Sequence, residues 1–289
     1  MSDHHPPILD THHHLWDLSR FRLPWLKGAP KLDRSFVMDD YSAATQGLGV
    51  MRTVYMEVDV APEQQVAEAE YVVELCRRPD NPVAAAVISG RPAEPGFAEY
   101  LDRWRGVPEI KGLRQVLHGE GTPAGYCLKP EFVRGMRLLG ERGLSFDLCM
   151  RHAEIPDGTR LIAQCPETRF ILDHCGNPPV RTNDRSRWEA DLAEMARRPN
   201  VVCKVSGIVA SVDPERWSAA DLRPIVEHVL REFGPDRVMF GGDWPVCTLG
   251  ATYRQWVEAL RAIVRGRSYA ERAKLFHDNA ARFYGLDTQ

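Results

Sequence analysis

The chain has no long apolar run, no paired cysteines and no cluster of basic residues. None of its apolar stretches approaches the roughly 18 residues that a membrane-spanning helix needs. Its 37 Lys and Arg residues nearly balance its 40 Asp and Glu residues, whereas nucleic acids and anionic membranes bind clustered positive charge. We therefore expect neither a nucleic acid nor a membrane as a partner.

Cysteine is present, but its spacing fits neither a disulfide framework nor a metal motif. The seven cysteines are scattered, odd in number and never form a CxxC pair. Residues 1–10 lack the cationic start and the apolar stretch of a secretory signal. These observations predict free thiols in a cytoplasmic protein.

Several motifs for nucleotides and nucleophiles are also missing. No GxGxxG follows the first apolar run, and the chain contains neither a P-loop nor a GxSxG nucleophile elbow. No Ser/Gly-rich linker or change of composition marks a boundary. Residues 1–289 are therefore expected to form a single domain.

The chain does contain eight short apolar runs, most of them followed by a helical pattern. The runs are continuously hydrophobic, which is typical of parallel strands covered on both faces. The predicted strands are 8–12, 53–57, 83–88, 109–115, 144–150, 169–174, 201–206 and 237–242. The predicted helices are 62–78, 130–142, 185–198, 214–233 and 252–264. This alternation favours a distorted α/β barrel of the (β/α)8 TIM type, with long βα loops and extra C-terminal helices.

Catalytic groups of such a barrel lie at the C-terminal ends of its strands. The first strand ends in Asp10-Thr11-His12-His13-His14, and strand alternation places Asp10, His12 and His14 on one side. Two imidazoles on one side suit a divalent metal, or a pair of donors to a carbonyl oxygen. An accidental run of histidines is the alternative.

Polar residues also end or occupy the other predicted strands. They are Glu57, Lys111, Arg114, Arg151, His152, Asp173, His174, Lys204 and Asp243. Lysine is scarce in this chain, and an unpaired lysine is costly to bury. Lys111 and Lys204 therefore either reach the polar barrel mouth or pair with a carboxylate, and the sequence leaves both alternatives open.

These segments together resemble the amidohydrolase superfamily, and within it the amidohydrolase-2 group that holds sugar-lactone hydrolases and 2-pyrone-4,6-dicarboxylate lactonase. The likeness runs in order through ILDTHHHLWDLSRFRLPWL, EIKGLRQVLH, SFDLCMRH, RFILDHCGNPP, VVCKVSG and RVMFGGDWPV. The resemblance implies a barrel with the site at its mouth. In metal-using members the corresponding ligands are His12, His14, His152, His174 and Asp243, and a carbamylated lysine at the fourth strand, here Lys111, bridges two metals. The lactonase-like group often needs no metal.

We therefore expect a hydrolase that opens a small, sugar-derived lactone to its hydroxy acid. Asp243 is the expected general base, and His12, His14 and His174 are expected to polarise the carbonyl and hold the oxyanion. The residues expected to bind substrate are Arg114, His152, Glu57, Trp16, Lys111 and Lys204. The expected cofactor is either none or one divalent metal, with zinc foremost.

Two alternatives remain open. One is a metal-dependent amidohydrolase or decarboxylase on the same barrel, in which a bound ion generates hydroxide and Asp243 moves protons. The other is a non-catalytic protein that binds a sugar acid or a metal.

Overall fold

The computed structural model describes residues 5–119 and 121–286, and its eight strands form a single parallel sheet in the order β1 to β8. The strands are β1 (Ile8–His13), β2 (Val50–Met56), β3 (Val83–Ser89), β4 (Ile110–Val116), β5 (Ser145–Cys149), β6 (Arg169–Leu172), β7 (Val201–Val205) and β8 (Val238–Phe240). All seven neighbouring pairs in this order are parallel. The expected fold class, a (β/α)8 barrel, is confirmed.

The sheet closes into a barrel through the segment that follows β8. The backbone N–H of Asp243 donates to the carbonyl oxygen of His12 at 2.6 Å, and that of His14 donates to Trp244 at 2.7 Å. The hydroxyl of Thr11 adds a bond to the carbonyl oxygen of Phe240 at 2.6 Å. Because these closing bonds join the ends of β1 and β8, they also fix the two segments that carry the predicted histidines and aspartate.

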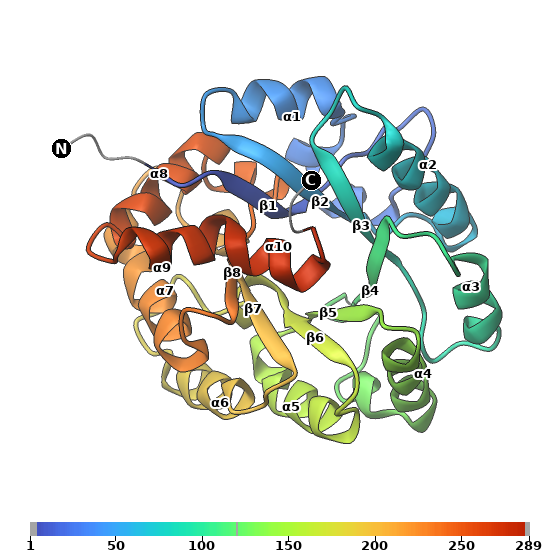
Figure 1. Cartoon of the computed structure of the whole chain (residues 1–289). Coiled ribbons are helices and arrows are strands. Elements are labelled where there is room, and N and C mark those ends of the chain that lie inside the picture. Colours follow the sequence, from blue (N-terminus) through green and yellow to red (C-terminus); the bar gives the residue numbers. More distant parts are fainter. Residues whose placement is uncertain (1–4, 120, 287–289) are drawn as a thin grey trace.

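Helices surround the barrel, as Figure 1 shows. They are α1 (Met38–Thr45), α2 (Gln65–Arg77), α3 (Phe97–Arg103), α4 (Pro130–Glu141), α5 (Ile155–Gln164), α6 (Ser186–Ala196), α7 (Ala219–Phe233), α8 (Tyr253–Ile263), α9 (Tyr269–Ala273) and α10 (Asn279–Tyr284). The five predicted helices are present with slightly different ends, whereas no range was predicted for α1, α3 and α5. Within residues 5–119 and 121–286, no helix is both long and apolar enough to cross a membrane.

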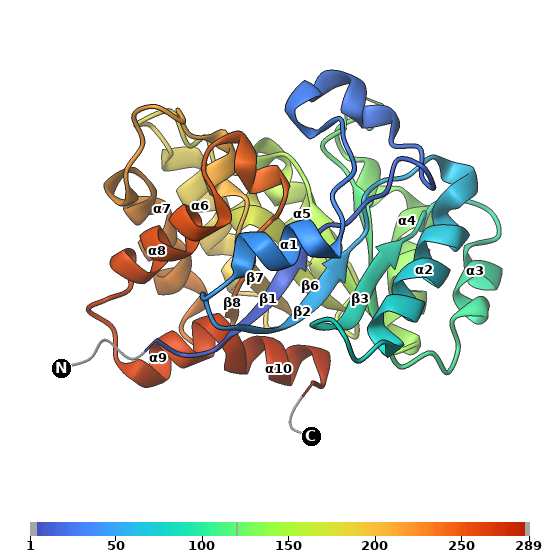
Figure 2. The same ribbon diagram turned by 90° about the horizontal axis from the view of Figure 1, so that it is seen from above.

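Two apolar layers hold these elements together. Strand residues such as Leu9, Val54 and Ile171 form an inner cluster, which also includes Ala280 and Tyr284 of α10. The larger cluster packs the strands against the surrounding helices. In side view, α9 and α10 lie across the end of the barrel where the strands begin (Figure 2), so the opposite end is left for the site.

A bulge in β1 interrupts the alternation of its side chains that the sequence predicts. Between Asp10 and His13, β1 advances three residues while β2 advances only two. Asp10 therefore faces the helices, where it accepts bonds from the hydroxyls of Tyr41 (2.9 Å) and Tyr253 (3.0 Å). His12 instead faces the barrel interior, so the prediction that Asp10 shares its side was wrong.

Candidate active site

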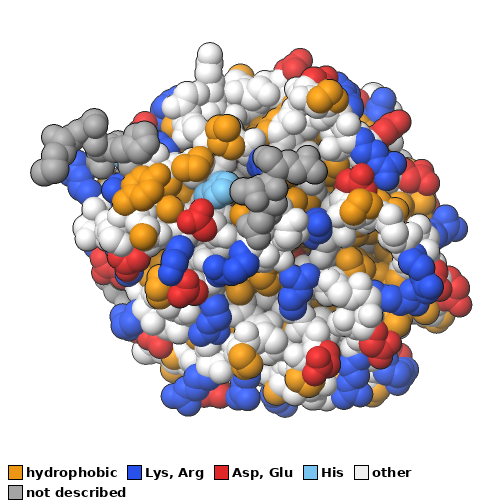
Figure 3. Space-filling view, in the orientation of Figure 1, with side chains coloured by type: hydrophobic (Ala, Val, Ile, Leu, Met, Phe, Trp, Pro, Cys, Tyr) orange, Lys and Arg blue, Asp and Glu red, His pale blue; other side chains and the backbone are white. Residues whose placement is uncertain are grey.

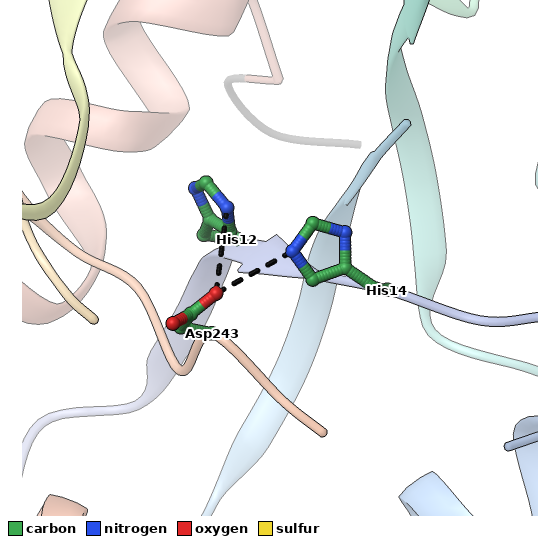
Figure 4. Close-up of side chains that lie close together, drawn as sticks. All are labelled: His12, His14 and Asp243. Atoms are coloured by element: carbon green, nitrogen blue, oxygen red, sulfur yellow. Dashed lines mark ion pairs between the residues drawn. The ribbon is translucent and has the colours of Figure 1, made fainter. Parts of the chain in front are cut away.

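Three imidazoles and one carboxylate meet at the C-terminal end of the barrel. The Nε2 atoms of His12, His14 and His174 lie 3.7, 3.4 and 4.0 Å from Oδ1 of Asp243. Figure 4 shows the rings of His12 and His14 converging on that oxygen from the end of β1. All four side chains are buried. The structure thus brings together the four residues that the sequence predicts as catalytic.

Two of these residues have unusual backbone conformations. Asp243 and His174 both have a φ of 53°, a left-handed value that non-glycine residues rarely adopt. The surroundings hold them there: Asp10 accepts the backbone N–H of Gly242 at 2.7 Å, and Nδ1 of His174 lies 3.0 Å from Oγ of Ser206. Such strained residues persist only where neighbouring structure fixes them, and they cluster at functional sites.

The hydrogen bonds of His14 fix its tautomer. Its Nδ1 lies 3.0 Å from the carbonyl oxygen of Met56 and 3.1 Å from that of Glu57, so Nδ1 carries the proton. Burial lowers the pKa of His14 to about 3, and the ring is neutral at physiological pH. Its Nε2 therefore presents a lone pair toward Asp243. In this form Nε2 has no proton to donate to a substrate carbonyl.

His12 is held in the same tautomer by a different partner. Nη1 of Arg114 lies 3.3 Å from Nε2 of His12, and a guanidinium can only donate. Nδ1 of His12 consequently carries its proton, and it lies 3.4 Å from Oδ1 of Asp173. Burial also holds the pKa of His12 well below its usual value, so this ring too is neutral.

Arg114 itself is fixed by Glu57. Its Nε donates to Oε1 of Glu57 at 2.7 Å, and its Nη2 donates to the Glu57 backbone carbonyl at 2.7 Å. Both side chains are almost completely buried. Glu57 therefore orients Arg114 and neutralises its charge. The expectation that Glu57 lines the substrate pocket was wrong.

A buried charge network lies behind the histidines. The ammonium of Lys204 pairs with Asp147 and lies 3.3 Å from Oδ1 of Asp173. Although burial alone would raise it, Lys204 holds the pKa of Asp173 well below its usual value. Lys204 is completely buried and paired, so it supports the site from within and was wrongly expected to bind substrate. Asp173 was expected at a strand end but without a role, and Asp147 was not predicted, although both lie within the motifs SFDLCMRH and RFILDHCGNPP.

These residues also fit one divalent cation. The potential ligand atoms of His12, His14 and Asp243 lie within 4.8 Å of one another. Neutral imidazoles whose Nδ1–H is held by a carbonyl or carboxylate oxygen are the usual form of metal-binding histidine. Burial raises the pKa of Asp243 to about 6 and that of Asp147 to about 7, as expected where buried carboxylates outnumber buried cations. A bound cation would offset that excess.

Three other predicted residues do not join this cluster. Lys111 is the second residue of β4, whereas the site lies at the C-terminal strand ends; it lines a cavity at the other end of the barrel. A Lys111 carbamate bridging two metals is therefore excluded by position. His152 follows β5 but belongs to neither candidate metal group among the described residues. Trp16 is 1% exposed and donates its indole N–H to Arg34, so it packs a loop.

Comparison with known proteins places this geometry in a family. Residues 9–286 match the family model described as Amidohydrolase. The chain belongs to the amidohydrolase family. It is 31% identical to L-fucono-1,5-lactonase of Burkholderia multivorans over 96% of each chain. It is also 26% identical to L-rhamnono-gamma-lactonase of Scheffersomyces stipitis, over 96% of this chain and 98% of that one.

A solved structure resembles this amidohydrolase closely. It is an amidohydrolase from Burkholderia multivorans with bound zinc, with a TM-score of 0.86 and 30% identity over 96% of this chain and 99% of that one. The expected enzyme class, a hydrolase that acts on ester bonds, is confirmed by these relatives. The bound zinc and the named lactones are properties of the relatives.

Proposed function

We propose that this amidohydrolase opens a small, sugar-derived lactone to its hydroxy acid, with Asp243 as the general base. The observation that carries the proposal is the placement of Oδ1 of Asp243 within 3.4 to 4.0 Å of three imidazole Nε2 atoms. Burial raises the pKa of this carboxyl to about 6, so at neutral pH it is ionised yet basic enough to accept a proton from water.

The reaction follows from that placement. Asp243 takes a proton from a water molecule as the water oxygen attacks the lactone carbonyl carbon. The ring C–O bond then breaks, and Asp243 returns the proton to the departing ring oxygen. Arg114 is the cationic donor beside this carboxylate, because its Nη1 already faces Nε2 of His12. Its fixed guanidinium can stabilise the oxyanion without reorganising.

The neutral histidines suit a supporting role in this scheme. His14 presents its Nε2 lone pair, whereas Nε2 of His12 accepts from Arg114. His12, His14 and Asp243 would hold a divalent cation if His12 gave up that bond. Such a cation, when bound, polarises the carbonyl as a Lewis acid. Elemental analysis of protein purified without added metal, with rates measured before and after chelation, distinguishes a metal-dependent reaction from a metal-free one. A stoichiometric metal whose removal abolishes turnover supports the metal-dependent reaction.

The arginines near the barrel mouth favour an uncharged substrate. Three of them are already paired with a carboxylate: Arg114 with Glu57 at 2.7 Å, Arg91 with Asp59 at 2.8 Å, and Arg151 with Glu154 at 3.0 Å. A substrate carboxylate would have to compete with these pairs, whereas sugar hydroxyls can bond to the carboxylate oxygens that remain. This favours an aldonolactone over a dicarboxylate lactone.

The proposal is tested with a panel of aldonolactones, whose hydrolysis releases acid that a pH indicator detects. We expect turnover of at least one neutral sugar lactone in preference to anionic lactones. Asp243→Asn should reduce the rate by about 10²-fold or more. Asp59→Asn is the matched control, since Asp59 lies near the mouth and pairs with Arg91. Near-complete activity of the Asp243 variant would contradict the assignment of the base.

A further inference from the structure

A cavity lies at the opposite end of the barrel from the histidines. Its volume is about 610 Å³, which is the size of sites that hold small molecules. It lies between the segment that precedes β4 and the chain around α10, the helix that crosses this end of the barrel (Figures 1 and 2). Trp104 and Phe283 are among its apolar walls.

The charged lining of this cavity has only one sign. Five of its lining side chains are cationic and none is acidic; the cations are Arg105, Lys111, Arg142, Arg169 and Arg282. Figure 3 shows several Lys and Arg side chains on this end of the molecule. Like charges gathered around a concave surface repel one another and attract a counter-ion.

One carboxylate compensates for only part of that charge. Asp102 lies 3.0 Å from Nη2 of Arg105 and 2.7 Å from Nη1 of Arg142, so two guanidinium groups share it. Among the described residues, Arg169 donates to neutral groups, the backbone carbonyls of Phe283 (2.7 Å) and Gly143 (3.0 Å). Burial lowers the pKa of Arg169, the direction expected for a cation that lacks a nearby carboxylate.

Arg282 and Lys111 also form no ion pair with a carboxylate of the described residues. Nη2 of Arg282 donates to the backbone carbonyl of Asp236 at 2.8 Å, while the Asp236 carboxylate binds Lys274 at 2.6 Å. Lys111 makes no ion pair with the residues that the structure describes, because Glu109, two positions earlier, is held by Arg77 at 2.8 Å. Within residues 5–119 and 121–286, these three lining cations thus form no ion pair with a carboxylate.

We propose that this cavity is a second ligand site, which binds a small multivalent anion such as a phosphate ester or a di- or tricarboxylate. Guanidinium groups match the oxygens of both kinds of anion, and a lysine adds a mobile point charge. The site is independent of the proposed lactone reaction. In this site Lys111, near the start of β4, binds the anion, whereas Arg114, further along the same strand, belongs to the active site.

Isothermal titration calorimetry of the full chain tests the site, with pyrophosphate and citrate as separate probes. We expect saturable binding of at least one probe with one site per chain, and a preference between them identifies the oxygen chemistry. Lys111→Gln should weaken binding by about tenfold, Lys111→Glu should abolish it, and Lys111→Arg should restore it. Lactone hydrolysis should change little in all three variants.

Lys31→Gln is the matched control, because Lys31 is an exposed lysine of the segment after β1. It removes the same charge, so it should leave the affinity unchanged. The proposal is overturned if neither anion binds saturably, or if Lys111→Glu binds as tightly as the unaltered chain. Equal weakening by Lys31→Gln would show general charge attraction and would also overturn it.

Discussion

Nη1 of Arg114 lies 3.3 Å from Nε2 of His12, and this contact fixes the proton of His12 on the other ring nitrogen. Arginine stays protonated and has no acceptor, so no other tautomer of a neutral His12 satisfies it. The guanidinium is positioned in turn by Glu57. The proposed chemistry at the barrel mouth therefore depends on the buried ion pair of Arg114 and Glu57.

The first prediction concerns that pair. Arg114→Gln leaves Glu57 buried without its cation, so we expect a loss of about 3 kcal/mol or more in the free energy of unfolding, together with loss of activity. In the double variant Arg114→Gln/Glu57→Gln, the uncompensated charge of Glu57 is gone, whereas Asp173 still lacks the guanidinium 3.7 Å away, so part of the stability should return. Activity should stay low because the donor is still absent. Urea denaturation and initial rates measure the two effects, and recovery of activity in the double variant would contradict a role for Arg114.

The second prediction is a pH profile of kcat/KM. Burial raises the pKa of Asp243 to about 6, and only the ionised carboxylate can accept the proton of water. The rate should therefore be nearly constant above about pH 7 and should fall by about tenfold per unit well below pH 6. Rates are corrected for spontaneous lactone opening. A constant rate down to about pH 4.5 would contradict this base.

The third prediction concerns Glu68, which is buried beside the site on α2. It accepts bonds from the hydroxyl of Tyr55 (3.0 Å) and the backbone N–H of Val58 (2.7 Å). Burial, with a smaller contribution from the nearby Glu57, raises its pKa to about 8. Between the ordinary glutamate pKa and this value, the folded chain holds a proton that the unfolded chain has lost. The contribution of Glu68 to stability is therefore greatest at low pH and is lost as pH rises toward about 8.

Replacing Glu68 isolates that contribution. Glu68→Gln cannot titrate, so its unfolding free energy should depend less on pH than that of the unaltered chain, by about 1 kcal/mol per unit between about pH 5 and pH 8. Denaturant unfolding at a series of pH values measures the difference. Glu70→Gln is an exposed change on the same helix, and it should leave the slope unaltered. Equal slopes for the unaltered chain and Glu68→Gln would refute the shift.

The fourth prediction concerns the network behind the histidines. Lys204→Met leaves Asp147 and Asp173 buried without their cation, and we expect a loss of about 3 to 5 kcal/mol in the free energy of unfolding. Adding Asp147→Asn should restore part of that loss. Lys31→Met, on the surface, should change stability little. The midpoints of thermal or urea unfolding measure these changes in stability. An unchanged midpoint for Lys204→Met would rule out a structural role for the Lys204–Asp147 pair.

The strands were predictable because burial on both faces leaves a continuous apolar signal, as in Val83–Ser89. The prediction for Asp10 failed because one bulge reverses every later side chain of β1, and nothing in the residues around it marks that bulge. Lys111 was misplaced although the predicted strand 109–115 already put it near the start of the apolar run, away from the end where a site is expected. Position along β4, and not residue type, separates Lys111 from Arg114.

The supporting residues were harder to predict than the reacting ones. His12, His14, His174 and Asp243 end apolar runs, so the barrel itself brings them together. Glu68 instead lies on a helix, where a carboxylate is ordinary, and only tertiary packing buries it. Its bonds with Tyr55 and Val58 connect α2 to β2 and the segment after it, and local sequence patterns do not predict which side chains of a helix and a strand meet.

The last prediction uses a glycine that lies against His174. A Cβ placed on Gly207 would come within 2.3 Å of Nδ1 of His174, and Gly207 has a φ of +68°. Gly207→Ala should therefore displace the ring and lower kcat by about tenfold or more, since small misplacements of catalytic groups are costly. Gly234 has a similar φ of +71° with nothing within 4 Å of the added Cβ. Gly234→Ala therefore carries the backbone strain without the clash, and it should lose stability but keep kcat. Equal kcat values in the two variants would show that the position of His174 is not critical to the reaction.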